Sequence, residues 1–388
     1  MTFEPIIRHM TDQDAYKFSM GQAVMHQEHM GVRLGEQEVE YKFIDRNGGQ
    51  CHPDLPSHII DQAMSMADLS LSDNEAMFLR RLPFIRPSYI EWLSNFRYNP
   101  HQVTAGRDSE GRLILGIRGP WETAIFWEVP LLALVSELTY RLDGLEPDPK
   151  YRAASEQKAR DLESNEVLFA DFGTRRRFSF DVQRNVVDDL SKSDTFLGTS
   201  NVYLAMLADR LPIGTQAHEW YMALAALFGW RMATRIGLEL WTSEYRGDLG
   251  IALTDTFTTR HFFQVFDMFF SKLFDGLRHD SGDPLEFAEL AMYCYRRQKV
   301  DPRSKTLVFS DGLTTAKAIE IANALDGKVK TSFGIGTHFT NDVGVDPLNI
   351  VIKMVRCGGR PTVKLSDIDG KHTGDPQAIR ECISALGI

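Results

Sequence analysis

From residue 167 onwards the 388-residue sequence repeats one local pattern five times, and this repetition limits the fold more than any other feature. In each copy a short apolar run ends in a polar or glycine-rich loop, and a helical pattern follows; the runs are residues 167–170, 250–253, 276–277, 306–309 and 330–333. Such copies are typical of βα units in a barrel or a doubly wound sheet. In both architectures the carboxyl ends of the strands meet around one mouth, where ligands bind. We therefore expect an α/β fold whose strand-end loops form one site.

The chain before residue 145 follows a different pattern. Residues 14–26 have a helical pattern, whereas residues 38–44 alternate polar and apolar side chains and precede a turn at 46–49. This mixture predicts an α+β domain. Residues 144–149 (GLEPDP) are rich in turn formers and predict a linker, and the polar run 151–165 predicts a solvated helix.

The end of the chain predicts a β-hairpin. Strand patterns at 349–356 and 361–366 flank the segment Cys357-Gly358-Gly359-Arg360. We expect this hairpin to rejoin the sheet of the first domain. The length of the chain exceeds that of a usual single core, which agrees with a large domain plus a second one.

Composition excludes several classes of function. The formal net charge of −10 argues against broad binding of nucleic acid or an acidic membrane, although it allows a local basic pocket. The four cysteines lie far apart and form no CxxC pair, so neither a zinc knuckle nor a disulfide framework is predicted. The first ten residues lack a secretory signal, and the apolar stretch near 129–135 is far shorter than the about 20 residues that span a bilayer. We expect a cytoplasmic protein.

One histidine stands at the start of a helical pattern. His218 follows the small-residue segment 213–217 and precedes the helical run 221–228. Because the first turn of a helix leaves backbone N–H groups unpaired, an anion is favoured beside this imidazole. A packed or solvent-facing histidine would give the same pattern, so support for His218 has to come from its neighbours.

Residues 278–283 (RHDSGD) place charges at the end of an expected strand. Arg278 can hold an anionic substrate, while Asp280 and Asp283 can orient a base or, through water, a hydrated Mg²⁺. Charged residues at a buried strand end are costly unless they have such partners. Asp, Ser and Gly are also favoured in surface turns, so an ordinary turn is the alternative.

Three further loops carry groups suited to a flat, anionic ligand. In residues 171–177 (DFGTRRR), a ring could stack on Phe172 while an arginine binds a carboxylate or phosphate; solvated arginines in a capping loop are the alternative. The glycines of residues 334–337 (GIGT) allow backbone amides to approach a phosphate. Asp311 could hold ribose hydroxyls, although a turn with a helix cap would look the same.

Taken in order, these segments resemble the nicotinate phosphoribosyltransferase family, which is related to nicotinamide phosphoribosyltransferase. The resemblance runs from residues 11–17 (TDQDAYK) to the C-terminal hairpin, so it covers nearly the whole chain. It implies an irregular (β/α) barrel, residues 146–345, packed on an α+β domain, residues 1–145, which the C-terminal segment 346–388 rejoins. It also implies a homodimer whose active sites lie at the subunit interface.

The resemblance also assigns the residues that bind substrates. Asp14 and Tyr16 would reach the neighbouring subunit's site, where Tyr16 and Phe172 would sandwich a pyridine ring. Arg278 would bind the nicotinate side and Arg175 the phosphate groups. The ribose and its 5′-phosphate would be held by Asp311, Gly336 and Thr337.

The implied reaction joins nicotinic acid to phosphoribosyl pyrophosphate in NAD salvage, with ATP as a co-substrate and Mg²⁺ as the cofactor. His218 matches a histidine that ATP transiently phosphorylates, with Asp255 and Asp280 nearby to orient it and Mg²⁺. Departure of pyrophosphate leaves a cationic ribosyl carbon that the ring nitrogen attacks, so the protein acts by positioning and by screening charge.

Ser200 bears on the choice of ring substrate. Nicotinamide-using relatives carry an aspartate at this position, and serine removes a negative charge that would repel a carboxylate. The alternatives are a nicotinamide-using phosphoribosyltransferase, a sugar-phosphate lyase or isomerase on a barrel, and a ligand sensor. The lyase or isomerase is disfavoured because such chemistry usually uses a barrel lysine, and no strand-end motif here contains one.

Overall fold

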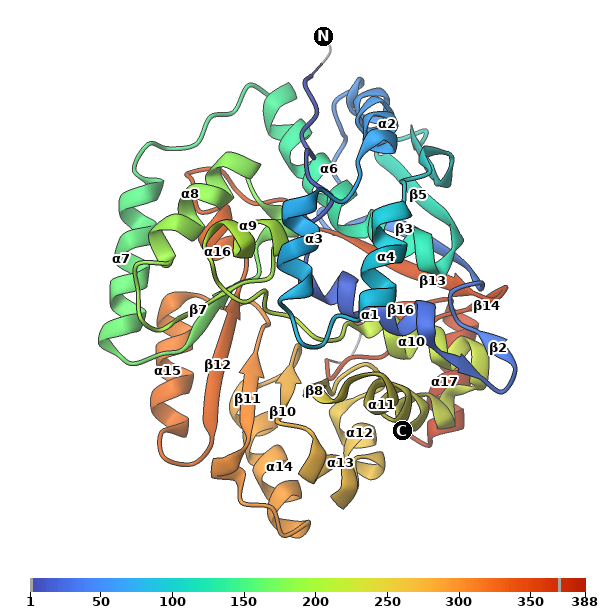
Figure 1. Cartoon of the computed structure of the whole chain (residues 1–388), viewed down its shortest axis with the longest axis vertical. Helices are drawn as coiled ribbons and strands as arrows, with labels where there is room; N and C mark the ends of the chain where they lie inside the picture. The colour runs from blue at the N-terminus through green and yellow to red at the C-terminus, as the bar shows by residue number, and fades with distance from the viewer. Residues whose placement is uncertain (1–2, 369–370) are drawn as a thin grey trace.

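The computed structural model describes residues 3–368 and 371–388 and contains two principal sheets (Figure 1). The larger sheet is parallel, with the order β7-β6-β12-β11-β10-β9. Its strands are β6 (Phe169–Asp171), β7 (Phe196–Thr199), β9 (Ile251–Leu253), β10 (Gly276–His279), β11 (Thr306–Phe309) and β12 (Lys330–Ile335). The other is antiparallel, with the order β14-β13-β3-β5-β4. The predicted α/β class, with a parallel sheet, is confirmed.

The parallel sheet contains all five of the predicted strands and one more. β11 has the predicted bounds, whereas β10 extends the predicted strand through Arg278 and His279. The additional strand, β7, was not predicted because Gly198 interrupts its short apolar run. Figure 1 shows the outer helices of this sheet, which are α7 (Tyr151–Ser164), α8 (Phe180–Leu190), α14 (Pro284–Arg297) and α15 (Thr315–Leu325).

An irregular segment connects the two edge strands of the parallel sheet. The backbone N–H of Ile213 donates to the carbonyl of Thr199 on β7 at 2.9 Å. Two residues later, the Thr215 hydroxyl donates to the carbonyl of Ile251 on β9 at 2.9 Å. The segment that precedes His218 is thereby fixed at both edges of the sheet.

The antiparallel sheet brings the end of the chain back to its beginning. β13 (Ile350–Cys357) pairs with β3 (Glu38–Asp45), which also pairs with β5 (Leu113–Pro120). The hairpin partner of β13 is β14 (Arg360–Pro361), and β4 (Val103–Arg107) forms the far edge. The chain then continues into β15 (Val363–Lys364), which pairs with β16 (Thr373–Gly374). This return carries two lysines, Lys353 and Lys364, towards the parallel sheet.

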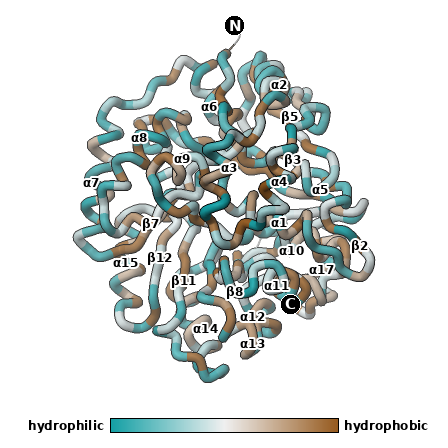
Figure 2. Tube along the Cα trace, viewed as in Figure 1, coloured by the Kyte–Doolittle hydropathy of each residue, from teal (hydrophilic) through white to brown (hydrophobic). Residues whose placement is uncertain are grey.

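Helix α1 (Ala15–His26) lies in the interior, because every residue from 15 to 24 is buried. The buried helices α6 (Glu128–Leu142), α10 (His218–Phe228) and α11 (Trp230–Tyr245) also belong to the core. The remaining helices and short strands are α2 (Leu55–Ser65), α3 (Asp73–Arg80), α4 (Pro87–Asn95), α5 (Trp121–Ala124), α9 (Val202–Leu207), α12 (Thr259–Val265), α13 (Met268–Leu273), α16 (Thr337–Thr340), α17 (Pro376–Leu386), β1 (Glu28–His29), β2 (Val32–Arg33) and β8 (Arg246–Leu249). Figure 2 shows hydrophilic residues along many of the outer loops. Within the described ranges, no helix combines the length and apolar character needed to cross a membrane.

We predict that Gly276→Ala destabilises the parallel sheet. A Cβ at Gly276 would lie 1.9 Å from the carbonyl oxygen of Thr306, its partner on β11, so the two strands would have to separate. We expect a loss of about 3 kcal/mol in the free energy of unfolding, measured by urea denaturation. Gly106→Ala is the matched control, because a Cβ there meets no atom within 4 Å. Equal stability of the two variants would contradict this account.

Candidate active site

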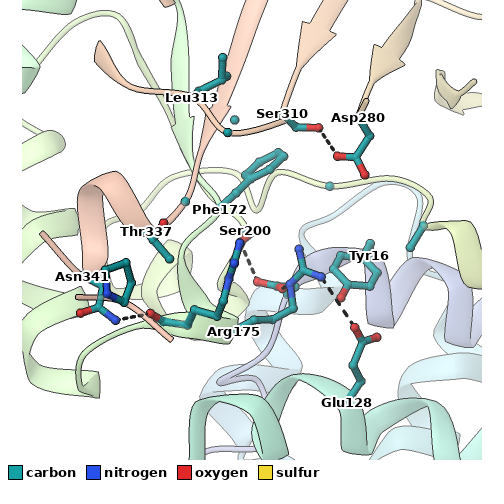
Figure 3. Close-up of a pocket in the computed structure, with 18 of the residues that line it drawn as sticks. Tyr16, Glu128, Phe172, Arg175, Ser200, Asp280, Ser310, Leu313, Thr337 and Asn341 are labelled. Carbon is teal, nitrogen blue, oxygen red and sulfur yellow. Dashed lines mark hydrogen bonds and ion pairs between the residues drawn. The ribbon is translucent and has the colours of Figure 1, made fainter. Parts of the chain in front are cut away.

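Polar side chains from the carboxyl ends of the parallel strands line one cavity of about 670 Å³. Figure 3 shows Phe172 after β6, Ser200 after β7 and Asp280 after β10 around this space. The opposite wall includes Tyr16 of α1 and Glu128 of α6. Lys353 of β13, from the C-terminal part of the chain, also lines it. The predicted meeting of strand-end loops is therefore observed, and a second wall faces them.

Two aromatic rings from distant parts of the chain face this cavity. A Cβ at Gly334 would lie 2.4 Å from carbons of the Phe172 ring, so only glycine on β12 leaves room for the ring. The backbone N–H of Phe172 donates to the carbonyl of Ile335 at 2.8 Å. The ring of Tyr16 also lines the cavity, and its buried hydroxyl has no hydrogen-bond partner among the described residues. Two such rings suit a flat ligand.

Arg175 is a cation beside the Tyr16 ring. Its guanidinium carbon lies 5.8 Å from the ring centroid, and its nitrogens lie 3.6 Å from Asp14 Oδ2 and 3.7 Å from Glu128 Oε1. Both distances exceed that of a hydrogen bond, so N–H groups remain available to a ligand. The Ser200 hydroxyl donates to Asp14 Oδ1 at 2.7 Å.

Asp14 and Tyr16 contact residues of their own chain. Asp14 binds Ser200 and faces Arg175, and Tyr16 lines the main cavity. The predicted reach of both residues to a neighbouring subunit's site stays a prediction, because the structure describes a single chain.

Arg278 and the glycine loop supply further groups for anions. Arg278 lines the cavity, and its buried Nε has no hydrogen-bond partner among the described residues. A buried cationic group without a partner is costly, so an anionic ligand would satisfy it. Gly336 and Thr337 line the same cavity, where Gly336 precedes the first residue of α16. Asp311 lines an adjoining cavity of about 690 Å³ instead.

The imidazole of His218 points into the main cavity towards Asp280. Its Nε2 lies 2.9 Å from Asp280 Oδ2, and its Nδ1 lies 3.0 Å from the hydroxyl of Thr256. Asp280 is itself fixed by the hydroxyl of Ser310, which donates to Oδ1 at 2.7 Å (Figure 3). Ala217, the residue before α10, has no side chain that could cap the helix, so no N-cap side chain accepts from the backbone N–H groups of the first helical turn.

Lys364 of β15 lies against the same nitrogen of His218. Its Nζ is 2.8 Å from His218 Nε2 and 3.4 Å from Asp255 Oδ2. An ammonium group can only donate, whereas the contact of Nε2 with Asp280 requires a proton on Nε2. Nε2 can therefore donate to Asp280 in one tautomer and accept from Lys364 in the other.

The protonation states of this group follow from burial and charge. Burial, and then the charge of Lys364, lower the pKa of His218 to about 4. Burial alone would raise the pKa of Asp280, but Arg278, His218 and Lys364 hold it well below its usual range. Near neutral pH the imidazole is uncharged, and in the tautomer that faces Lys364 its Nε2 carries a lone pair that a ligand can use once Lys364 turns away from it.

Asp255 and Asp280 fit a divalent cation together with His218. One ligand atom from each residue lies within 4.8 Å of the others, and the buried Oδ1 of Asp255 has no hydrogen-bond partner among the described residues. Mg²⁺ prefers carboxylate oxygens of this kind. The Ser281 hydroxyl donates to Asp255 Oδ2 at 2.6 Å and so fixes the second oxygen.

Asp283 does not join this group. The positive φ of 90° at Gly282 turns the chain, and Asp283 accepts hydrogen bonds at 2.9 Å from two backbone N–H groups in the first turn of α14. Asp283 also lines a separate cavity. In the structure Asp283 therefore caps α14, and its predicted role beside a hydrated Mg²⁺ stays a prediction.

The main cavity brings most of the predicted site residues together: Asp14, Tyr16, Phe172, Arg175, Ser200, His218, Arg278, Asp280, Gly336 and Thr337. Asp255 is fully buried, with Oδ1 3.8 Å from His218 Nε2. Asp311 in the adjoining cavity and Asp283 in the separate one lie outside the group.

Sequence reasoning missed the charged residues of the second wall: Lys17, Glu128, Glu219, Lys353 and Lys364. None of them stands in a glycine-rich loop. The available signal was a charge within an apolar segment, as for Lys353 in the strand IVIKMV, where burial lowers the lysine pKa to about 8. An interior charge of this kind predicts a buried partner or a ligand.

The parallel sheet, the facing rings and the unpartnered arginine at its edge define an α/β enzyme that binds anionic ligands. The chain belongs to the nicotinate phosphoribosyltransferase (NAPRTase) family, a family of transferases: the family model matches residues 167–385, and the model of the family's N-terminal domain matches residues 11–136.

Individual relatives cover almost the whole chain. A nicotinate phosphoribosyltransferase of Chromohalobacter salexigens is 47% identical over 380 residues, which are 95% of this chain and 96% of the relative. The crystal structure of nicotinate phosphoribosyltransferase from Porphyromonas gingivalis has a TM-score of 0.95 at 41% identity and covers 99% of this chain and 100% of that one. The structure of a putative nicotinate phosphoribosyltransferase from Saccharomyces cerevisiae has a TM-score of 0.94 at 30% identity and covers 100% of both chains.

We predict that Lys364→Met raises the pKa of His218. The substitution removes a positive charge that disfavours the imidazolium and leaves Asp255 and Asp280, which favour it, so the pKa moves up from about 4 towards the ordinary value of 6.5. NMR titration of the imidazole in metal-free protein measures this change. Lys328→Met is the control, because Lys328 is exposed and contacts only a nearby backbone carbonyl. An unchanged pKa in the Lys364 variant would show that the contact has no electrostatic effect.

Proposed function

We propose that the protein transfers the phosphoribosyl group of phosphoribosyl pyrophosphate to nicotinic acid, with ATP as a co-substrate that phosphorylates His218. The products are nicotinate mononucleotide, pyrophosphate, ADP and phosphate. The observation that carries this proposal is the position of the His218 imidazole, 2.9 Å from Asp280 in the cavity that Phe172 and Arg278 also line. A nucleophile, a ring-binding site and cations for anionic groups thus share one space.

Nicotinic acid would bind between the rings of Tyr16 and Phe172. The unpartnered Arg278 would receive its carboxylate, since the guanidinium Nε is buried and lacks another partner among the described residues. Arg175 and the loop ending in Gly336 and Thr337 would bind phosphate groups, the loop through backbone N–H groups. Asp311 in the adjoining cavity would accept hydrogen bonds from ribose hydroxyls.

The transfer breaks the bond between ribose C1 and the pyrophosphate oxygen and forms a bond from the pyridine nitrogen to C1. Positive charge develops on the sugar, and the fixed carboxylates of Asp255 and Asp280 stabilise it without forming a covalent ribosyl intermediate. Mg²⁺, when bound by these carboxylates, would neutralise charge on the departing pyrophosphate.

Phosphorylation of His218 would use the tautomer in which Nε2 faces Lys364. Nε2 attacks the terminal phosphorus of ATP, ADP departs, and water later cleaves the N–P bond to release phosphate. The ammonium of Lys364 and the uncapped first turn of α10 would balance the added negative charge. The phosphoryl group would then tighten the binding of substrate through the cations around the cavity.

We also infer that the parallel sheet is part of an irregular barrel, residues 146–345, against which residues 1–145 and 346–388 pack. The segment that hydrogen-bonds to both edge strands, β7 and β9, supports this description. A homodimer is likewise proposed. In this dimer Asp14 and Tyr16, which line a cavity of their own chain, would also face the neighbouring subunit's site.

A lysine-dependent lyase or isomerase is the second candidate. Lys353 favours it, because this buried lysine lines the cavity and has a pKa lowered by burial to about 8. It differs from the expected barrel lysine in coming from β13 of the antiparallel sheet. Borohydride trapping with a keto-sugar phosphate tests this candidate, and the absence of a covalent adduct would exclude it.

We predict that His218→Ala retains basal transfer but loses stimulation by ATP. The substitution removes the phosphoryl acceptor and leaves the ring-binding residues in place. Product formation from nicotinic acid and phosphoribosyl pyrophosphate, with and without ATP, measures both quantities. His101→Ala, at an exposed position outside the cavity, serves as the control. Full ATP stimulation in the His218 variant would refute the phosphohistidine.

We predict that Ser200→Asp lowers kcat/KM for nicotinic acid by about tenfold or more and shifts preference towards nicotinamide. The new carboxylate would lie beside Asp14, whose Oδ1 is now 2.7 Å from the serine hydroxyl, and would add negative charge near the ring. Ser200→Ala, which adds no charge, is the matched control. A panel of nicotinic acid, nicotinamide and quinolinic acid measures the preference. An unaltered ratio would remove Ser200 as a determinant of selectivity.

A further inference from the structure

A buried lysine joins two carboxylates beneath the ring-binding part of the cavity. Lys17 Nζ lies 2.7 Å from Glu128 Oε2 and 2.5 Å from Glu219 Oε2, and the lysine side chain has no exposed surface. The three residues come from three different helices, α1, α6 and α10. Both carboxylates border the cavity, whereas the ammonium is enclosed between them.

Several donors hold the carboxylate of Glu219 in place. Glu219 Oε1 accepts hydrogen bonds from the hydroxyl of Tyr41 at 2.6 Å and from the indole N–H of Trp121 at 2.7 Å. Together with Lys17, three donors therefore fix this carboxylate. Because Glu219 follows His218 in the first turn of α10, its position constrains the turn that presents the imidazole.

Glu128, the second carboxylate of the bridge, lies near Arg175 and, through it, near Tyr16. Glu128 Oε1 faces Arg175 at 3.7 Å, as Figure 3 shows, and the guanidinium of Arg175 lies beside the Tyr16 ring. On the other side of the bridge, Lys17 directly follows Tyr16 in α1. The bridge is thus connected to Tyr16 both along the helix and through Arg175.

Lys17 and Glu128 stabilise each other in their charged forms. Burial lowers the pKa of Lys17, but Glu128 and Glu219 outweigh it and raise the value above that of an ordinary lysine. Burial likewise opposes the charge of Glu128, yet Lys17 and Arg175 hold its pKa below the ordinary value. Replacing a buried ion pair by apolar residues is often neutral or stabilising, so stability alone is a weak reason for such a group.

We propose that Lys17, Glu128 and Glu219 form a positioning bridge that fixes the ring-binding Tyr16 and the phosphate-binding Arg175 relative to the helical turn carrying His218. This inference rests on the proposed function, because it assigns the two ends of the bridge to the ring substrate and to the ATP-dependent step. The three residues act through their neighbours, so altering each arm should disturb a different part of the reaction.

Glu128→Gln tests the arm that leads to the ring. The amide keeps the shape of the side chain but loses the charge that holds Arg175 beside the Tyr16 ring. We therefore expect the KM for nicotinic acid and the KM for phosphoribosyl pyrophosphate each to rise about tenfold, with stimulation by ATP kept. Glu137→Gln is the matched control. Glu137 is a buried acid on the same helix, pairs with Arg141 and the backbone N–H of Phe180, and lies outside the cavity.

Glu219→Gln tests the arm that leads to His218. An amide cannot accept from all three donors around Glu219 without placing its own N–H₂ against one of them, so the first turn of α10 should shift. We expect the ratio of rates with and without ATP to fall towards one, with a smaller change in the KM for nicotinic acid than in Glu128→Gln. Thermal unfolding of every variant shows which proteins are folded.

The outcomes separate this inference from the proposed function. A wild-type protein that forms no nicotinate mononucleotide would overturn the function itself. An active wild type in which Glu128→Gln lowers the melting temperature, but keeps the kinetic constants of Glu137→Gln, would overturn the positioning bridge. If Glu219→Gln does not fold, the two KM values of Glu128→Gln decide between the outcomes: a rise in both supports the positioning bridge, and values equal to those of Glu137→Gln overturn it.

Discussion

The contact of His218 Nε2 with both a carboxylate and an ammonium is the constraint on which the site depends. Its three members come from distant elements: α10 carries the imidazole, the end of β10 carries Asp280, and β15 carries Lys364. Lys364 lies at the site because β13 pairs with β3, which brings the C-terminal part of the chain back to the N-terminal sheet. The mixed architecture is therefore needed for the chemistry, since the parallel sheet alone would supply the carboxylate without the ammonium.

Local charge in the cavity contrasts with the charge of the whole chain. The formal net charge is −10, yet Arg175, Arg278, Lys353 and Lys364 gather around the site. Burial makes each of these cations costly unless anions accompany it. Some of the partners belong to the protein, as in the pairing of Arg175 with Asp14 and Glu128. Because the protein does not pair all of these cations, the cavity favours anionic ligands, in agreement with the negatively charged substrates proposed above.

The repeated strand-loop-helix pattern was sufficient to predict the parallel sheet and the loops at its edge. It placed β11 correctly and brought Phe172, Arg278 and Asp280 to one mouth. It could not identify Lys364, because that residue joins the site through strand pairings between parts of the chain that are far apart in sequence. It could not separate the two roles of Asp283, since a carboxylate that caps a helix, as this one does, and one that binds a cation through water have the same local sequence.

The environment of Ser200 changes the argument about substrate choice. From the sequence, serine leaves this position without a negative charge. In the structure the hydroxyl of Ser200 donates to Asp14, so a carboxylate lies in the same place but belongs to another residue. Burial raises the pKa of Asp14, and Arg175 opposes this effect. Acceptance of an anionic ring therefore depends on the charges of Asp14, Glu128 and Arg175 together rather than on position 200 alone. Lys17 contributes to this balance, because its ammonium group offsets part of the negative charge that Glu128 presents to Arg175.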